Sequence, residues 1–371
     1  MKILIATGLY PPEIGGPATY SQCLEELLPL HGRAVSVLPF SRVRKFPKII
    51  RHIVYFFLIL REGWHSDVIY AQDPISVGIP SMCAAFLMRK TFLLKIVGDY
   101  AWEQATQRFA FSGTPEDFQT ATVHPVARLL RALERLVARR AKAVIVPSKY
   151  LGKIVRLWGV PQKKLQVIYN GIESLGETGN KMVLRGLINF HGKLLISVGR
   201  LVPWKGFGVL IEALPHLREQ FPDLKLLIVG SGPQLPLLEQ KAQELHLENE
   251  IIFTGALSRD VLIRYIRASD VFVLNTSYEG LSHQILEVMA VGVPVVTTAI
   301  GGNPEVIEHE KNGFLIKPND LTALVRYTGD LLQHAQLRAK IVSAGKRTVL
   351  GFSNEKMVAE TSTFLKKIEK S

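Results

Sequence analysis

Residues 271–297 read VFVLNTSYEGLSHQILEVMAVGVPVVT, and this stretch shows the repeating unit from which we expect the fold to be built. The apolar run 271–274 has the length of a strand, and a second run, 294–297, follows a helical pattern that begins after Ser282. Continuous apolar runs are typical of strands buried on both faces of a parallel sheet. The stretch therefore predicts a strand, a helix and a second, parallel strand.

Runs of the same kind recur along the chain, with room for a helix between them. They cover 3–7, 35–38, 68–71, 92–97, 143–146, 165–169, 194–198, 225–229, 251–254, 271–274, 294–297 and 313–316. This rhythm predicts an α/β protein with two doubly wound, Rossmann-like domains that face each other across a cleft. In such sheets the ligand lies outside the carboxyl ends of the strands, so we expect the functional residues in the loops there.

A polar, glycine-bearing stretch near residue 174 separates the two halves, and the charge balance changes at the same place. Residues 1–172 carry 23 Lys and Arg against 11 Asp and Glu, whereas residues 173–371 carry 22 against 21. We expect an N-terminal domain over 1–174, a C-terminal domain over 175–352, and a C-terminal helix over 353–371 that packs back on the first domain. The positive half points to an anionic partner: membrane phospholipid, nucleic acid or a phosphorylated substrate.

The composition is that of a globular protein: 371 residues, 47% of them hydrophobic and 21% charged. No apolar run reaches the roughly 20 residues of a membrane-spanning helix, and the first residues lack a secretory pattern, so we expect a cytoplasmic protein. Cys23 and Cys83 are too few for a disulfide scaffold, and both read as core thiols.

Two loops after predicted strands combine glycine with groups suited to phosphate. Gly15 and Gly16 precede a helical pattern, where backbone N–H groups favour an anion, although an ordinary strand-to-helix loop also explains them. Gly199 and Arg200 end a strand, and Lys205 precedes the next helix. The two cations can clamp a diphosphate and stabilise the charge that appears as it departs; the alternative is a pair of solvated loop cations.

Two glutamates lie eight positions apart after the strand 271–274. We expect Glu279 in the loop, Ser282 as helix N-cap and Glu287 in the second turn of an apolar helix. At about 1.5 Å per residue their Cα atoms would be on the order of 12 Å apart, a span suited to binding two ends of one ligand through its hydroxyl groups. A buried carboxylate without donors is costly, and the hydroxyl groups of such a ligand would supply donors to Glu287. The alternative for Glu287 is a solvated charge on the helix surface.

With these motifs the chain resembles the family 4 retaining glycosyltransferases of the GT-B fold. The specific part is Glu279, Glu287 and the Met-Ala-x-Gly-x-Pro segment that follows them, and the resemblance spans most of the chain. Other segments that resemble the family are Gly15–Gly16, Pro147–Ser148, Asn170–Gly171, Gly199–Arg200, Lys205–Gly206, Gly230–Pro233, Gly292–Val296 and Gly301–Glu305.

By this resemblance the catalytic residues would be Arg200, Lys205 and Glu279: the cations would hold the donor diphosphate, and Glu279 the hydroxyls of the transferred sugar. Glu287 would bind the ribose. The other implied donor-binding positions are Gly15, Gly16, Gly199, Gly232, Thr254, Gly255, Gly280, Leu281 and Ser282. The implied reaction transfers a sugar from a UDP-, GDP- or ADP-sugar to an acceptor hydroxyl with retention. The leaving phosphate takes the proton, and no protein nucleophile is needed.

One position departs from the family pattern, because the His that many members carry after the fourth strand is missing here. Asp99 stands there, followed by Tyr100 and Trp102. Asp99 would orient the acceptor, or it caps a helix with Trp102 packed beneath it; His124 reads as a loop residue rather than a substitute. The sequence has no D-x-D triplet, so no metal cofactor is expected.

The basic half suggests a membrane surface. Five cations precede the apolar run 53–60 with no acid between them, namely Arg42, Arg44, Lys45, Lys48 and Arg51. A second row recurs on one helical face, at Arg128, Arg131, Arg135 and Arg139, and its alternative is a solvated face. We expect contact with anionic lipid and a lipid-linked or membrane-bound glycan as acceptor, with the protein peripheral on the inner face of the plasma membrane.

Two other kinds of protein remain as alternatives. One is a nucleotide-sugar epimerase or a phosphorylase of the same fold, which would not need an acceptor hydroxyl. The other is a nucleic-acid-binding protein that uses the basic half. Its aromatic residues argue against it, because Tyr55, Phe56 and Phe57 lie in an apolar block rather than between cations. We therefore expect no nucleic acid partner.

Overall fold

The computed structural model describes residues 1–13, 15–173, 181–187 and 192–370. Within them the chain divides into two compact units. Unit 1 comprises residues 1–171 and 353–371, and unit 2 comprises residues 172–352. The boundary that we expect between 174 and 175 lies outside the described residues.

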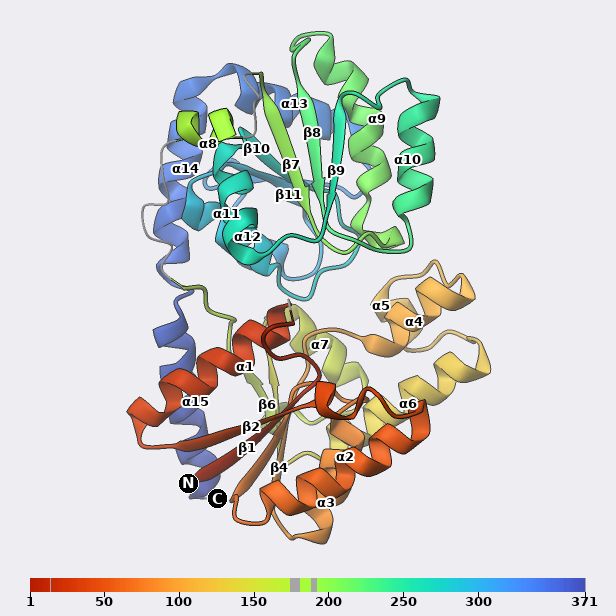
Figure 1. The fold of residues 1–371 in the computed structure, drawn as a ribbon, viewed down its shortest axis with the longest axis vertical. Helices are drawn as coiled ribbons and strands as arrows, with labels where there is room; N and C mark the ends of the chain where they lie inside the picture. Colours follow the sequence, from red (N-terminus) through yellow and green to blue (C-terminus); the bar gives the residue numbers. More distant parts are fainter. Residues whose placement is uncertain (14, 174–180, 188–191, 371) are drawn as a thin grey trace. The chain divides into compact units, whose positions relative to one another are not determined.

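Unit 1 is built on a parallel six-stranded sheet with the order β2-β1-β3-β4-β5-β6 (Figure 1). Its strands are β1 (Lys2–Thr7), β2 (Ala34–Pro39), β3 (Val68–Ala71), β4 (Thr91–Lys95), β5 (Ala143–Val146) and β6 (Leu165–Val167). Its helices are α1 (Gly16–Leu27), α2 (Lys48–Gly63), α3 (Gly78–Leu87), α4 (Tyr100–Phe109), α5 (Pro115–Phe118), α6 (Pro125–Arg140), α7 (Lys149–Leu157) and α15 (Asn354–Glu369).

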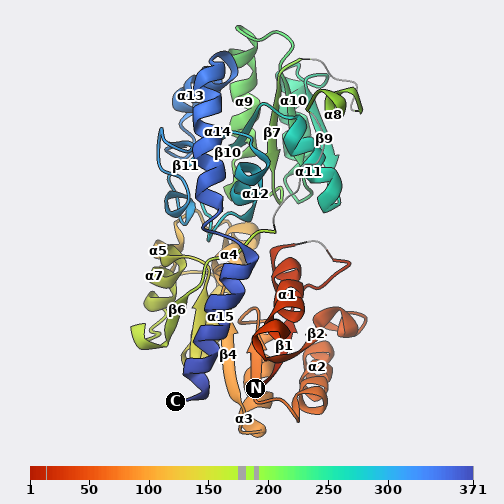
Figure 2. The same ribbon diagram turned by 90° about the vertical axis from the view of Figure 1, so that its left-hand side faces the viewer.

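Alternate residues of the central strands enter the two cores of unit 1. Leu4 of β1 packs into the core that contains α2, α3, α6 and α7, whereas Ile3 and Ile5 face the core formed with α1 and α15. Leu365 of α15 is fully buried in this second core, and Figure 2 shows α15 running beside α1. Because side chains alternate across a strand, apolar residues at every position of these strands are buried by helices on both faces.

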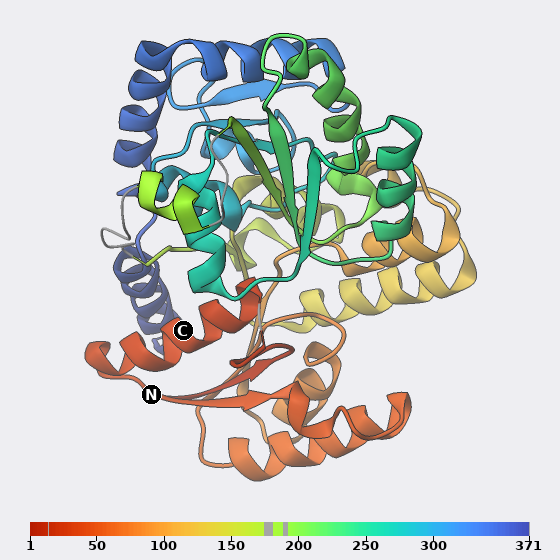
Figure 3. The ribbon, with the colours of Figure 1, turned by 45° about the horizontal axis from the view of Figure 1, so that its top comes forward.

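Unit 2 repeats the design with the strand order β12-β11-β10-β7-β8-β9. Its strands are β7 (Leu194–Val198), β8 (Lys225–Val229), β9 (Ile251–Gly255), β10 (Val271–Leu274), β11 (Val295–Thr298) and β12 (Phe314–Ile316). Its helices are α8 (Lys181–Leu187), α9 (Phe207–Arg218), α10 (Leu235–Glu244), α11 (Arg259–Ala268), α12 (His283–Val291), α13 (Leu321–Gln333) and α14 (Ala335–Val349). Figure 3 shows α9 and α10 on one side of the strands and α11 and α12 on the other.

The predicted fold class is confirmed, since each unit is a parallel α/β sheet wrapped by helices. Every predicted strand is present within two residues of its expected ends. One smaller expectation is wrong: Cys23 is buried as predicted, but Cys83 is exposed on α3. Among the described residues, no helix combines the length and apolar character needed to cross a membrane.

Candidate active site

The candidate site begins where the direction of strand order reverses in unit 2. Strands β7 and β10 are neighbours, and the chain continues from β7 toward β8 on one side and from β10 toward β11 on the other. Ligands of doubly wound sheets bind at such a switch point, outside the carboxyl ends of the strands. Arg200 follows β7 and Glu279 lies in the loop after β10, so the topology brings the predicted residues to this edge.

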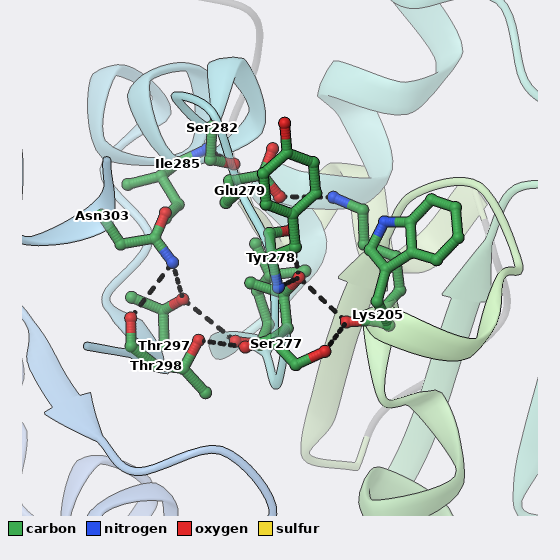
Figure 4. Close-up of polar contacts among 12 residues, drawn as sticks. Lys205, Ser277, Tyr278, Glu279, Ser282, Ile285, Thr297, Thr298 and Asn303 are labelled. Carbon is green, nitrogen blue, oxygen red and sulfur yellow. Dashed lines mark hydrogen bonds and ion pairs between the residues drawn. The ribbon is translucent and has the colours of Figure 1, made fainter. Parts of the chain in front are cut away.

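Lys205 and Glu279 form an ion pair between these two loops (Figure 4). Both side chains are largely buried, so the pair is less screened than a surface contact. Arg200 lies over the ring of Trp204, with the guanidinium carbon 5.6 Å from the ring centroid. Lys205 is therefore not a solvated loop cation, whereas Arg200 is exposed and lies over the ring of Trp204.

Backbone and hydroxyl groups fix the loop that carries Glu279. The carbonyl of Trp204 accepts from Ser277 N at 2.7 Å and from Thr276 Oγ1 at 3.0 Å, which ties the loop after β10 to the turn that carries Lys205. Thr298 Oγ1 donates to Thr276 O at 2.6 Å, and Asn303 Nδ2 donates to Thr298 O at 3.1 Å (Figure 4). This network pre-organises the charged pair above it.

Glycine lets the backbone approach closely at two points of the same edge. Gly206 has φ +62°, and a Cβ there would lie 2.0 Å from Asn275 O. Gly301 has φ +61°, and its Cβ would lie 1.9 Å from Glu279 O. Both the left-handed conformation and the lack of space exclude larger residues. These glycines therefore set the positions of the Lys205 and Glu279 loops.

Glu287 lies on α12, which begins at Ser282 as predicted. The Ser282 hydroxyl accepts from Ile285 N at 3.4 Å. Glu287 is only 5% exposed, so the alternative of a solvated surface charge is wrong. Its Oε1 lies 3.4 Å from Arg259 Nε and 3.9 Å from His283 Nδ1. The donors that a buried carboxylate requires thus come at least partly from the protein.

Sequence reasoning missed Arg259, which is the first residue of α11. A cation at a helix N-terminus opposes the helix dipole, so its presence there is a signal that an anionic partner lies nearby. Arg259 has two such partners, because its Nη1 also lies 2.5 Å from Glu173 Oε2. These two acids raise the pKa of Arg259 even though partial burial acts in the opposite direction.

The remaining predicted donor positions of unit 2 lie in loops that are joined at the same edge. Gly199 N donates to Val229 O at 3.0 Å, and Gly230 N donates to Gly255 O at 2.9 Å. A Cβ on Gly232 would lie 2.4 Å from Leu201 O. The loops after β7, β8 and β9 are therefore in contact with one another. Thr254 lies near the end of β9, and its hydroxyl donates to Gly255 O at 2.9 Å.

The other predicted residues belong to unit 1. Gly15 is the N-cap of α1 and Gly16 its first residue, as the helical pattern predicted. Asp99 caps α4: its Oδ1 accepts from Trp102 N and its Oδ2 from Gln119 Nε2, both at 2.8 Å. Trp102 is buried, whereas Tyr100 remains partly exposed. The structure thus realises the capping interpretation of Asp99, and its role toward an acceptor stays a prediction.

Asp99 is also part of a buried pair of carboxyl groups. Glu134 of α6 accepts from Tyr100 N at 3.0 Å and from Ala101 N at 3.2 Å, which places both acids at the N-terminus of α4. Burial raises the pKa of Asp99 to about 6. Burial, and then the neighbouring Asp99, raise the pKa of Glu134 well above its ordinary value. At mildly acidic pH the pair therefore retains protons that exposed carboxyl groups lose.

A second acid that sequence reasoning missed is Asp73, just after β3. Strands β1 and β3 are neighbours at the switch point of the unit 1 sheet, so Asp73 occupies the ligand-binding edge there. Its Oδ1 accepts from Ile75 N at 2.9 Å and from Ser76 N at 2.5 Å. Burial raises its pKa to about 6, although these backbone donors act in the opposite direction. The sequence signal was an Asp-Pro pair one residue after the end of the buried strand β3.

Three of the four arginines in the cationic row of α6 donate to backbone carbonyls of neighbouring segments. Arg131 donates to the carbonyls of Phe118 and Ala121, Arg135 Nη2 donates to Gln119 O at 2.8 Å, and Arg139 Nε donates to Trp158 O at 2.6 Å. His124 caps α6, and its ring stacks on Phe109. The arginines thus anchor neighbouring loops by backbone contacts, a role that neither interpretation of the row anticipated.

Two family models match the chain, one in each half. The model "Glycosyltransferase Family 4" matches residues 12–174, and the model "Glycosyl transferases group 1" matches residues 186–348. Among curated proteins, an uncharacterized glycosyltransferase of Methanocaldococcus jannaschii is 32% identical over 60% of this chain and 59% of its own length. A GDP-mannose-dependent alpha-(1-6)-phosphatidylinositol monomannoside mannosyltransferase of Mycolicibacterium smegmatis is 35% identical over 42% of this chain and 43% of its own.

Solved structures share the fold over nearly the whole chain. HepE of Anabaena in complex with UDP-glucose has a TM-score of 0.74 at 23% identity and covers 98% of this chain and 100% of its own. Sucrose-phosphate synthase of Thermosynechococcus elongatus has a TM-score of 0.79 at 19% identity and covers 100% and 99%. The matched segments span less than two thirds of the curated relatives. Because a glycosyltransferase family model matches most of each unit, the chain belongs to the family 4 and group 1 glycosyltransferases and has their GT-B fold.

Proposed function

We propose that this protein is a retaining glycosyltransferase that moves a sugar from a nucleotide-sugar donor to an acceptor hydroxyl. The observation that carries the proposal is the Lys205–Glu279 ion pair at the switch point of the unit 2 sheet, with Arg200 beside it. A cation for the diphosphate and an acid for the sugar then stand side by side. The HepE complex with UDP-glucose supports a nucleotide sugar as the class of donor.

Each charged side chain has a distinct role in this proposal. Arg200 and Lys205 bind the diphosphate and stabilise the charge that develops as it leaves. Without donor, Lys205 and Glu279 neutralise each other; a diphosphate gives Lys205 a stronger partner and frees Glu279 to accept from sugar hydroxyls. Glu287, oriented by Arg259, accepts from the ribose hydroxyls.

The backbone positions complete the donor site. Gly232, Thr254 and Gly255 flank the base, because their loops follow the strands on the β8 side of the sheet. Amide groups supply further donors to the phosphates and the sugar, at Gly15, Gly16, Gly199, Gly280, Leu281 and Ser282. No cofactor is required beyond the donor, which would be a UDP-, GDP- or ADP-sugar.

The reaction exchanges one bond at the anomeric carbon for another on the same face of the sugar. The bond from this carbon to the donor phosphate oxygen breaks, and a bond to the acceptor oxygen forms. The acceptor proton passes to the released phosphate oxygen, so the products are a glycoside and a nucleoside diphosphate. Asp99, Tyr100 and Trp102 lie on the acceptor side in this proposal.

The exposed face of α2 favours an acceptor at a membrane. Ile49, Ile53 and Phe57 recur every fourth residue and are 77%, 52% and 61% exposed, so they form an apolar ridge on one side of the helix. Arg42 and Arg44 pair with Glu62 and Glu13, while in the described part of the chain Lys48 has no acidic partner.

An apolar ridge beside cations fits the surface of an anionic leaflet. The mycobacterial relative acts, by its name, on a phosphatidylinositol mannoside. We infer a lipid-linked or membrane-associated glycan as acceptor, and a peripheral position on the inner face of the plasma membrane.

A panel of nucleotides and nucleotide sugars tests the donor site through thermal stabilisation. A ligand at 100 times its Kd adds about 2.7 kcal/mol to the free energy of unfolding. We expect one nucleotide sugar to stabilise the wild type, Glu287→Gln to abolish the gain, and Glu239→Gln, an exposed control in the same unit, to retain it. A gain that Glu287→Gln leaves unchanged would refute the role of this acid.

Product analysis separates the proposal from its alternatives. With the stabilising donor, sugar should be released only when an acceptor hydroxyl is present, and the anomeric configuration should be kept. A changed sugar without acceptor would indicate an epimerase, and sugar phosphate formed from inorganic phosphate would indicate a phosphorylase. Salt-sensitive binding to nucleic acid without donor binding would favour the nucleic-acid reading.

A further inference from the structure

Unit 1 contains a cavity of about 640 Å³ at the amino ends of its strands. It is lined by the C-terminal part of α3, by the end of α6 and by the residues that lead into β4, β5 and β6. Its volume lies in the range of small-molecule sites, roughly 300 to 1,000 Å³. The described residues that line it include five cations and no acid: Arg89, Lys90, Arg140, Lys142 and Lys164.

Four of these cations have no partner among the residues that the structure describes. Within the described chain, Arg89, Lys90, Arg140 and Lys142 make neither an ion pair nor a side-chain hydrogen bond. Lys164 is the exception, since its Nζ donates to Arg139 O at 2.8 Å and to Ala141 O at 2.9 Å. Like charges around one cavity repel each other, and a bound phosphate would relieve that repulsion through charge-assisted hydrogen bonds.

The other wall of the cavity is apolar. Met82, Phe86 and Phe92 line it, and Phe86 is 83% exposed. A free phosphate would use the cations but leave this wall in water. A ligand with a phosphate head and an apolar body would use both, because removing apolar surface from water is favourable.

We propose that this cavity is a second ligand site that takes an amphiphilic phosphate, with the phosphate among Lys90, Arg140 and Lys142 and the apolar chain against Phe86. The site is separate from the candidate acceptor residues, because Asp73 and Asp99 follow the carboxyl ends of β3 and β4, whereas the cavity lies at the amino ends. At about 3.3 Å per residue, the five residues of β4 separate the two edges by roughly 16 Å.

The chain carries its own reporter for this site. Cys83 is exposed and lines the cavity, whereas Cys23 is buried. The rate at which a maleimide alkylates Cys83 therefore measures access to the cavity, and Cys83→Ser gives the background. Dihexanoyl phosphatidic acid, kept below its micelle concentration, serves as the amphiphilic phosphate.

We expect saturating dihexanoyl phosphatidic acid to slow the alkylation of Cys83 at least fivefold. Dihexanoyl phosphatidylcholine and inorganic phosphate at the same concentrations should each have less than a twofold effect. Equal protection by inorganic phosphate would overturn the role of the apolar wall, and equal protection by the zwitterionic lipid would overturn the role of the cations. No protection by any of the three would overturn the site itself.

Charge reversal locates the effect. Lys142→Glu should abolish the protection, while Lys153→Glu, a change of another exposed lysine on α7 outside the cavity, should retain it. Two controls without lipid show that the fold and the thiol are intact. Each variant should have the circular dichroism spectrum of the wild type, and its Cys83 should be alkylated at the wild-type rate. Protection that survives in Lys142→Glu would place the lipid elsewhere and contradict the proposal.

Discussion

Arg259 at the start of α11 and Glu287 in α12 form an ion pair, with Arg259 Nε 3.4 Å from Glu287 Oε1. The acid is almost fully buried, whereas the arginine is about one third exposed. A buried carboxylate is costly unless a donor compensates it, and a helix N-terminus disfavours a cation unless an acid lies nearby. Arg259 therefore offsets the cost of burying the Glu287 carboxylate, and Glu287 offsets the cost of a cation at the start of α11. The pair also fixes the direction of the Glu287 side chain.

The first prediction concerns this pair. Arg259→Met leaves the buried Glu287 without its cation and should lower the free energy of unfolding by about 1 to 3 kcal/mol. Glu287→Gln removes the charge, so adding Arg259→Met to it should cost markedly less. Urea unfolding of the four proteins gives the coupling energy in a double-mutant cycle. Strict additivity of the two changes would show that the pair contributes nothing.

The second prediction concerns Lys205. If this ammonium stabilises the departing diphosphate, Lys205→Met should lower kcat on the order of 10²- to 10³-fold, as the loss of one electrostatic donor does elsewhere. Lys241→Met is the matched control, because Lys241 pairs with Glu212 in the same unit but away from the switch point. Initial rates with the stabilising nucleotide sugar measure both. Similar losses in the two variants would indicate a general effect of removing an ion pair.

The third prediction concerns Gly301, whose backbone packs against the carbonyl of Glu279. Gly301→Ala forces a left-handed alanine and a Cβ that meets the carbonyl of Glu279, so we expect a loss of roughly 2 kcal/mol or more in stability together with weaker donor binding. Gly208→Ala is the control, since a Cβ there meets nothing closer than 3.6 Å. Unfolding midpoints and donor titrations compare the two. Unchanged donor affinity in Gly301→Ala would contradict the link between this turn and the Glu279 loop.

The sequence predicted what depends on local pattern. Each strand is a short, continuous apolar run, and such a run is typical of a strand buried on both faces of a parallel sheet. Ser282 is the N-cap of α12 and Glu287 lies in its second turn, as the helix-start signal and the helical period predicted. The resemblance to the family supplied the roles of Lys205 and Glu279, and the structure shows these two side chains in contact.

The rest depends on partners that are distant in sequence. Arg259 lies 28 residues before Glu287, and the acids Asp99 and Glu134 are separated by 35 positions, so no local pattern announces either pair. The arginine row of α6 has the spacing of a helix face, but its backbone acceptors come from loops whose approach only the tertiary fold decides. The spacing of the arginines in the sequence therefore predicted which face of α6 they share, but not which carbonyl groups they contact.

The fourth prediction concerns the apolar ridge of α2. Replacing Ile53 and Phe57 together by Gln should weaken binding to vesicles of phosphatidylglycerol and phosphatidylcholine at least tenfold, because two exposed apolar side chains lose their burial in lipid. Leu30→Gln is the control, since Leu30 is 79% exposed in the same unit but outside α2. Vesicle sedimentation measures all three proteins. Equal binding would exclude the ridge as the membrane contact.

The fifth prediction concerns the pH dependence of stability. The pKa of Asp99 is raised from 3.8 to about 6, and the pKa of Glu134 is also raised. At a pH between the ordinary and the raised pKa of each acid, the folded state therefore binds more protons than the unfolded state. The contribution of the pair is therefore complete below about pH 4 and is lost as the pH rises through 6 and beyond, on the order of 1 to 3 kcal/mol.

Urea unfolding at intervals from pH 4 to pH 8 measures this slope. Glu134→Gln keeps a neutral side chain at the N-terminus of α4 and removes the acid that is coupled to Asp99, so it should flatten the decline. Glu360→Gln, an exposed change on α15, should follow the wild type. Because other carboxyl groups with ordinary partners act in the opposite direction, the difference between the two variants isolates the pair. An identical slope in both would mean that Glu134 binds protons equally in the folded and unfolded states, which would contradict a raised pKa for this acid.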